Sequence, residues 1–330
     1  MKEPVRRIRR PWLVYGCIAA IAAAYFGLIA KHRYPEPGEN LRYDIAALEE
    51  ADQVETRFEE TGRLTPALED PSALAVLRDG RLLVGGKDAA VVLSDGGDEV
   101  ARFALPGTAT SMTQAPDGEL LIALRDHVVT FSPEGVLKAT WGAPDPKTYI
   151  TSLAADEGNV YAADAGNRVV YRFDRAGALQ ARIGEADPGR DIRGLVVPSP
   201  YFDVALNSEG TLWIVNPGEL GLESYRPNGD LITSWYRPSM KLEGFCGCCN
   251  PSHVAFMPDG RLVTAEKGLV RVKIYEVTAG TFQELVAGSG LFPKEQAVRD
   301  LAVDAQGRIL VLDPRHDAVR VFEAKENGHA

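Results

Sequence analysis

Residues 251–275, PSHVAFMPDGRLVTAEKGLVRVKIY, carry the pattern on which the fold of this 330-residue chain can be read. An apolar run ends at the turn Asp259-Gly260, a second run begins at Leu262, and a third ends at Tyr275. An acidic residue followed by glycine between two β-rich runs is typical of a tight β-hairpin, because glycine readily adopts the positive φ that such turns require. The stretch therefore predicts consecutive antiparallel strands.

The same unit recurs six times along the chain. The glycines of its first turn are Gly80, Gly118, Gly158, Gly210, Gly260 and Gly307. Their successive spacings of 38, 40, 52, 50 and 47 residues match the period of a four-stranded propeller blade. We therefore predict an all-β, six-bladed β-propeller over residues 53–324. A strand near residues 54–65 is expected to complete the sixth blade, since that closure leaves no open sheet edge.

Two units resemble a known repeat. Residues 153–173, which include VYAADAGNRV, and residues 301–322 are similar to NHL repeats. The segment FCGCCNP, residues 245–251, also resembles a segment of membrane-anchored bacterial NHL-type proteins. The resemblance covers about residues 70–324 and implies the propeller fold. It implies no single activity, since propellers of this sort serve as interaction platforms, lactonases, amidating lyases and sensors.

The N-terminal region predicts a membrane anchor. Residues 1–10 are rich in arginine, and residues 11–30 contain no charged side chain and are long enough to span a bilayer as a helix. The excess of basic residues before the span places the N-terminus in the cytoplasm. We expect a single-pass protein of the bacterial inner (cytoplasmic) membrane, with the propeller in the periplasm. Residues 31–52 are predicted to be a linker with a short helix, and residues 325–330 a disordered tail.

Charge limits the partners. The net charge is −10, and it would be more negative without the basic residues 1–33. We therefore expect no nucleic-acid partner, and the expected partners are other membrane or periplasmic proteins. A cleaved signal peptide is the alternative to a retained anchor, because Ala22-x-Ala24 matches a cleavage site.

Three cysteines crowd into four positions before the fifth unit. Cys246, Cys248 and Cys249 are followed by His253. One interpretation is a disulfide, either Cys246–Cys249 or Cys248–Cys249, with one thiol left free. A second is a metal site in which the thiolates and His253 hold zinc, copper or an iron–sulfur cluster. A third is thiol–disulfide exchange or electron transfer.

A further set of polar residues lies six positions after the turn glycines. In four units the residue has a carboxylate or amide side chain: Asp164, Asn216, Glu266 and Asp313. These side chains either bond the backbone of the next turn or form a partial ring of oxygen ligands for a divalent cation such as calcium. Most are expected to lie off the axis, because the second strand of a blade is not the innermost one. Strand alternation places them on the same propeller face as the cysteines.

Two functions are compatible with these features. The first is a membrane-anchored, extracytoplasmic binding or assembly module in a redox or metal-handling membrane system, with the cysteine segment at its contact face. The alternative is a metal-dependent hydrolase or lyase, lactonase-like or amidating-lyase-like, with its site on the same face. The chain contains no G-x-S-x-G or H-E-x-x-H motif.

Overall fold

The computed structural model of the chain describes residues 45–292, 297–313 and 315–325. The predicted cytoplasmic tail and membrane anchor, residues 1–30, and the tail residues 326–330 lie outside these ranges. Within them, no helix has both the length and the apolar character that a membrane span requires. The described residues divide into two units between Ala47 and Leu48. A short helix, α2, covers Ile45–Ala51, as the sequence predicts.

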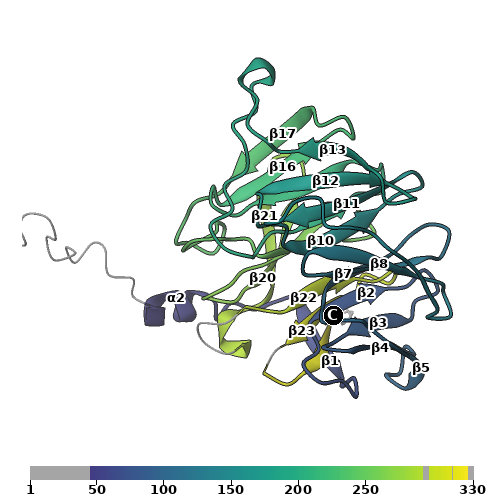
Figure 1. Ribbon diagram of the computed structural model, residues 1–330. Helices are drawn as coiled ribbons and strands as arrows, with labels where there is room; N and C mark the ends of the chain where they lie inside the picture. Colours follow the sequence, from purple (N-terminus) through teal and green to yellow (C-terminus); the bar gives the residue numbers. More distant parts are fainter. Residues whose placement is uncertain (1–44, 293–296, 314, 326–330) are drawn as a thin grey trace, which may run out of the picture. The chain divides into compact units, whose positions relative to one another are not determined.

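The second unit contains six four-stranded antiparallel sheets, the blades of a propeller (Figure 1). Blade 1 contains β2 (Ala73–Val76), β3 (Leu82–Gly85), β4 (Ala89–Leu93) and β5 (Glu99–Ala104). Blade 2 contains β6 (Ala109–Gln114), β7 (Leu120–Leu124), β8 (His127–Phe131) and β9 (Leu137–Thr140). Blade 3 contains β10 (Ile150–Ala155), β11 (Asn159–Asp164), β12 (Val169–Asp174) and β13 (Leu179–Ile183).

The other blades follow the same order from the innermost strand outward. Blade 4 contains β14 (Val204–Leu206), β15 (Leu212–Asn216), β16 (Gly221–Tyr225) and β17 (Leu231–Tyr236). Blade 5 contains β18 (His253–Phe256), β19 (Leu262–Ala265), β20 (Val272–Glu276) and β21 (Thr281–Ala287). Blade 6 contains β22 (Asp300–Val303), β23 (Ile309–Asp313), β24 (Ala318–Ala324) and β1 (Phe58–Leu64). The six-bladed all-β propeller that the repeat predicts is therefore confirmed.

The ring is closed by strands from the two ends of the propeller. Strand β1 pairs with β24 in antiparallel register, with Phe58 opposite Ala324 and Leu64 opposite Val319. This pairing confirms the predicted closure and gives the last blade its fourth strand. Neither end of the propeller then presents an unpaired edge from an incomplete blade.

The first turn of each blade has the conformation that the glycines predict, with one exception. Five of the six turn glycines have a positive φ, between 75° at Gly210 and 90° at Gly118. Gly158 is the exception, because the Asp156 carboxylate accepts hydrogen bonds from the backbone N–H groups of Gly158 (2.8 Å) and Asn159 (2.7 Å) instead. That turn is held by a side chain rather than by a left-handed glycine.

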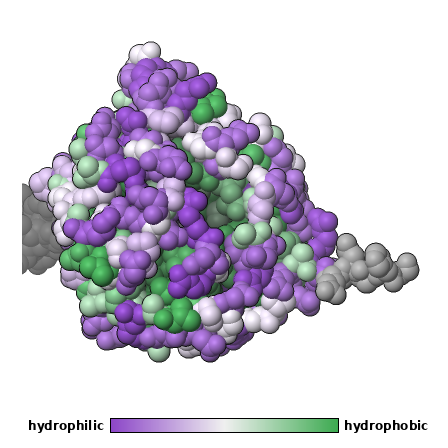
Figure 2. Space-filling model, turned by 90° about the vertical axis from the view of Figure 1, so that its right-hand side faces the viewer, coloured by the Kyte–Doolittle hydropathy of each residue, from purple (hydrophilic) through white to green (hydrophobic). Residues whose placement is uncertain are grey.

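The core lies between neighbouring blades. Second strands such as β7 and β15 are buried at every position, whereas the outermost strands β5 and β9 are almost wholly exposed. Burial on both faces explains why the second strands are continuous apolar runs. Figure 2 shows one face of the molecule with a hollow in its middle, where apolar residues line the floor and mostly hydrophilic residues surround it.

Candidate functional site

Two cavities lie along the propeller axis. The first, about 290 Å³, is a channel lined by the innermost strands of all the blades. The second, about 720 Å³, lies where the innermost strands begin, and we call it the channel mouth. Its lining includes Thr110, Tyr149, Thr151, Tyr201, His253 and Arg299. The inter-blade loops lie at this end, which we call the loop face.

One equivalent position in each blade lies near the start of the innermost strand, and in every blade except the first its residue lines the channel or the mouth. These six positions, which we call the axial ring, are Ala73, Ser111, Ser152, Asp203, His253 and Asp300. Each of these residues lies opposite a residue of the second strand in the same hairpin. That partner directly precedes the predicted polar position: His253 lies opposite Ala265, and Asp300 opposite Leu312. The six positions are therefore structurally equivalent.

The axial ring connects neighbouring blades through side chains. Ser111 Oγ accepts the backbone N–H of Leu153 at 3.0 Å, and Ser152 Oγ accepts that of Val204 at 3.2 Å. Asp203 then accepts from Val254 at 2.7 Å. In each case the donor belongs to the innermost strand of the next blade.

The last of these bonds joins the ends of the ring. Asp300 of blade 6 accepts the backbone N–H of Leu74 in blade 1 at 2.7 Å. It supplements the β1–β24 pairing at the closure of the propeller.

Burial changes the protonation of three ring residues. Burial raises the pKa of Asp203 to about 6, although the hydrogen bonds that this carboxylate accepts act to lower it. Burial, and then the charge of Asp203, raises the pKa of Asp300 to about 8. Burial lowers the pKa of His253 to about 4, and its Nδ1 lies 3.1 Å from Ser252 Oγ. At neutral pH the His253 imidazole in the mouth is therefore neutral, and the pKa values of the nearby Asp203 and Asp300 carboxyls are raised.

The predicted polar positions of the second strands lie one strand further out, and we call them the outer positions. All four are buried, and the structure does not bring them together: Asp164, Asn216, Glu266 and Asp313. Each is bonded within or beside its own blade. The physical reason is their place on the second strand, whose side chains do not reach the axis.

Two of the outer positions support the loop face through hydrogen bonds. Asp164 Oδ1 accepts the backbone N–H groups of Tyr149 and Gly166, both at 2.8 Å. Asn216 Oδ1 accepts from Val196 at 2.9 Å. These contacts confirm the expectation that such side chains bond the backbone of neighbouring turns.

The third outer position, Asp313, is fixed by an ion pair as well as by hydrogen bonds. The Asp313 carboxylate pairs with Arg320 Nη1 at 3.1 Å and lies 3.1 Å from His316 Nδ1. It also accepts the backbone N–H of Arg315 at 2.9 Å. Its oxygens are therefore occupied by groups of its own blade.

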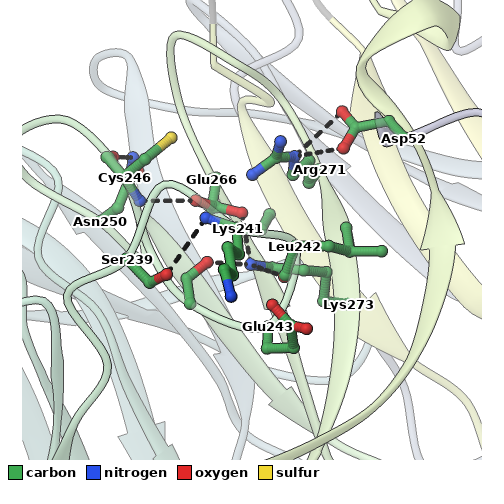
Figure 3. A network of polar contacts seen from close by, with 12 residues as sticks. Asp52, Ser239, Lys241, Leu242, Glu243, Cys246, Asn250, Glu266, Arg271 and Lys273 are labelled. Carbon is green, nitrogen blue, oxygen red and sulfur yellow. Dashed lines mark hydrogen bonds and ion pairs between the residues drawn. The ribbon is translucent and has the colours of Figure 1, made fainter. Parts of the chain in front are cut away.

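Glu266 belongs to a buried charge network (Figure 3). Lys273 Nζ lies 2.7 Å from Glu266 Oε1 and donates to the carbonyl of Gly244 at 2.6 Å. Arg271 Nε lies 2.8 Å from Asp52 Oδ1. All four ionised side chains are at most 2% exposed, so each charge depends on its partner to offset the loss of solvation. Burial lowers the pKa of Lys273, and Glu266 opposes that change.

The network holds the cysteine loop, which we define as residues 245–250. The backbone N–H of Cys246 donates to Glu266 Oε2 at 3.3 Å. Asn250 Nδ2 donates to the carbonyl of Cys246 at 2.7 Å, and Asn250 Oδ1 accepts the N–H of Lys267 at 2.8 Å. The loop is thus fastened to the β19–β20 hairpin, as expected for elements that share a face.

The three thiols of the loop are free and differ in environment. Cys248 is exposed, Cys249 is buried and Cys246 is intermediate. Burial, and then the charge of Glu266, raises the pKa of Cys246. Burial also raises the pKa of Cys249. Lys267 Nζ lies 4.0 Å from Cys248 Sγ and 5.1 Å from the centre of the Tyr201 ring, so the loop adjoins the channel mouth.

The predicted metal ligands do not converge on one point. Among the described residues, which include Cys246, Cys248, Cys249 and His253, no group of three or more histidine, cysteine, aspartate or glutamate side chains has an arrangement that could hold a metal ion. His253 faces the channel mouth, whereas Cys246 faces the buried charge network. The zinc, copper, iron–sulfur and calcium sites therefore stay predictions from the sequence.

Sequence reasoning did not single out the axial ring. Its signal is positional: the ring residue lies seven residues before the turn glycine, or six in blade 3 with its shorter turn. The residue types at these positions range from alanine to aspartate, so no common side chain reveals them. The sequence pattern places His253 beside the cysteines, whereas in the structure its neighbours are the ring residues Asp203 and Asp300.

A third cavity lies on the opposite face. It has a volume of about 880 Å³ and is lined by the first turns of blades 1, 5 and 6. Its charged groups pair with one another, as Arg81 does with Asp79 and Arg261 with Asp259. The loop face is the better candidate, because it combines an exposed thiol, a neutral histidine and the mouth of the channel.

Comparisons with known proteins identify the fold. A streptogramin B lyase structure aligns with a TM-score of 0.57 and 11% identity, over 82% of this chain and all of that one. The virginiamycin B lyase of Staphylococcus aureus aligns with a TM-score of 0.55 and 14% identity, over 80% of this chain and 99% of that one. The WD40 propeller domain of Doa1 aligns with a TM-score of 0.52 and 15% identity, over 77% and 79%. At these identities the likeness shows the propeller fold alone.

Sequence comparisons add no family. No family model matches the chain, and no curated protein sequence matches it. The NHL resemblance therefore stays a prediction about sequence, whereas the propeller architecture that it implies is confirmed.

Proposed function

We propose that this chain is a binding module whose contact surface is formed by the cysteine loop, Lys267 and the rim of the channel mouth. We further propose that the module is tethered to the bacterial inner membrane and works on the periplasmic side, as the N-terminal sequence indicates. One observation carries the proposal. An exposed thiol, Cys248, lies beside a cation that reaches over Tyr201 to the edge of a cavity of about 720 Å³.

The surface has the composition of a recognition site. Long loops on one face of a rigid scaffold commonly carry binding residues. Here the loop of residues 185–200 and the cysteine loop both bond the turn after β15: Val196 O accepts the N–H of Gly218 at 2.8 Å, and the N–H of Asn250 donates to Pro217 O at 3.2 Å. Tyrosine and lysine side chains at the rim offer partly apolar surface and positive charge to an electronegative or aromatic group of a partner.

Site-specific photocrosslinking in intact cells tests this proposal. A photoreactive residue at Tyr201 should give a discrete adduct with a membrane or periplasmic protein. The matched control is Asp95, an exposed residue at the cavity of the opposite face. Equal adducts from both positions, or none from Tyr201, would contradict a contact surface at the loop face.

The second candidate function is a metal-dependent hydrolase or lyase at the channel mouth. The observation that favours it is the neutral His253 beside the ring carboxyls of Asp203 and Asp300, within a propeller fold shared with two lyases. A thermal-shift titration with calcium, magnesium, manganese and zinc tests it. Stabilisation that is abolished by both Asp203→Asn and Asp300→Asn would favour the enzyme, and no shift with any of the metals would count against it.

A further inference from the structure

We propose that Cys248 and Cys249 form a vicinal dithiol that exchanges with a disulfide presented at the loop face, with Cys248 as the attacking and Cys249 as the resolving thiol. This inference rests on the proposed contact surface and names the chemistry of that surface. Cys246 takes no part in the exchange.

The two thiols differ in access, as the two roles require. Cys248 is exposed, whereas Cys249 is only 2% exposed. Lys267 Nζ lies 4.0 Å from Cys248 Sγ, so a positively charged side chain adjoins the exposed sulfur. Burial disfavours the thiolate of Cys249 and shields this sulfur from disulfides in solution, so its partner is the mixed disulfide on the adjacent Cys248. An accessible thiol beside a protected one thus suits attack followed by resolution.

The backbone keeps the two thiols together. Cys249 has a φ of 67°, a left-handed conformation that is unfavourable for residues other than glycine. Such a conformation persists where the surrounding structure imposes it. Here Asn250 supplies that restraint, through bonds to Cys246 and Lys267 on either side. Cys248 and Cys249 are adjacent in the chain, and after burial the neighbouring Cys248 thiol is a further cause that raises the pKa of Cys249.

The third cysteine faces a different environment. The charges that act on the Cys246 thiol are those of Glu266, Arg271, Lys273 and Asp52, whereas Cys249 responds to Cys248, Ser199 and Lys267. Of the two disulfides that the sequence leaves open, we assign Cys248–Cys249, because Cys246 lies beside the buried charge network, where its backbone N–H donates to Glu266 Oε2 at 3.3 Å.

The exchange balances in two steps. The Cys248 thiolate attacks one sulfur of a disulfide R–S–S–R, forms a mixed disulfide and releases the first thiolate, which takes up the proton that Cys248 lost. Cys249 then gives up its proton and attacks Cys248 Sγ, and the second thiolate leaves and is protonated. The chain ends with a Cys248–Cys249 disulfide, and the substrate disulfide is reduced to two thiols.

The test uses the reduced full chain in detergent and two disulfide probes, oxidised glutathione and a disulfide-linked peptide. We expect the wild type to release two thiols per chain and to lose two hydrogens by mass. Cys249→Ser should stop at a one-probe adduct on Cys248, and Cys248→Ser should lose the fast reaction. Cys246→Ser is the matched control and should react like the wild type. The chain has a fourth cysteine, Cys17, within the predicted membrane span, and peptide mapping separates its reaction from that of the loop.

Several outcomes would overturn the inference. These are an adduct on Cys246, a Cys246–Cys249 bond, or wild-type exchange no faster than that of the urea-unfolded chain. A metal ion that copurifies with the wild type and is lost in both Cys246→Ser and Cys248→Ser would overturn it as well. If only the peptide reacts, the surface selects for a polypeptide disulfide; if both probes react equally, it does not. Crosslinking at Tyr201 depends on no thiol, so the proposed function and this inference can fail separately.

Discussion

The outer positions and the axial ring both bury carboxylates, but they compensate for burial in different ways. At the outer positions, Glu266 pairs with Lys273 and Asp313 with Arg320. In the axial ring, Asp203 and Asp300 accept backbone N–H groups, and neither takes part in any ion pair found among the described residues. A buried carboxylate beside a cation can keep its charge, whereas one without a cation holds its proton more tightly.

The same repeat position can therefore have two different structural roles. Asp164 of blade 3 and Glu266 of blade 5 are equivalent, yet Asp164 bonds local backbone and the longer Glu266 reaches both a lysine and the cysteine loop. The backbone of the blade fixes the position of the Cα atom, and the length of the side chain determines which groups it can reach.

The largest effect is expected where a buried charge loses its partner. Lys273→Met should lower the free energy of unfolding by about 3–5 kcal/mol, because Glu266 would stay buried without a cation. Urea denaturation followed by tryptophan fluorescence measures this loss. The double variant Glu266→Gln/Lys273→Met removes both charges and should recover much of it. A single variant as stable as the wild type would show that Glu266 does not depend on Lys273.

A smaller loss is expected at the equivalent position of blade 3. Asp164→Ala leaves the backbone N–H groups of Tyr149 and Gly166 without their acceptor, which should cost about 1–3 kcal/mol. Asp164→Asn retains one oxygen and should cost less. Alkylation of Cys248 should be unchanged in both variants, because blade 3 does not hold the cysteine loop. An altered alkylation rate would mean that the outer positions act together.

The sequence was sufficient for the architecture because the architecture is local and repeated. The turn glycines mark each hairpin, and the closure by β1 follows from a last unit that contains only three strands. The exception at Gly158 was not predictable from spacing, since it depends on the side chain of Asp156.

The candidate site was less predictable, because it depends on contacts between units. The pairing of Arg271 with Asp52 joins residues 219 positions apart. The axial ring exists only once six blades are closed, and its members share a place rather than a residue type. The left-handed backbone of Cys249 is likewise specified by no pattern in the segment CGCC.

The smallest expected effect concerns the pH dependence that the axial ring produces. The pKa of Asp300 is raised to about 8, so the folded chain holds this proton more tightly than the unfolded chain. Its contribution to stability is present at low pH and is lost as the pH rises toward 8. The lowered pKa of His253 acts only below about pH 6.5, and the Asp203 carboxyl, with a pKa of about 6, has largely ionised above that value. Asp300 should therefore dominate the ring's response between pH 6.5 and 8.

Asp300→Asn isolates this contribution. Across that window the wild type should lose about 1–2 kcal/mol of unfolding free energy more than the variant does, since one proton accounts for at most about 1.4 kcal/mol per pH unit. The variant should start lower, because an amide has one oxygen for the N–H groups of Leu74 and Leu301, but it should respond less to pH. Parallel pH profiles for the two chains would mean that Asp300 is ionised throughout the window, and the contrast between the axial ring and the cation-paired outer positions would then not hold.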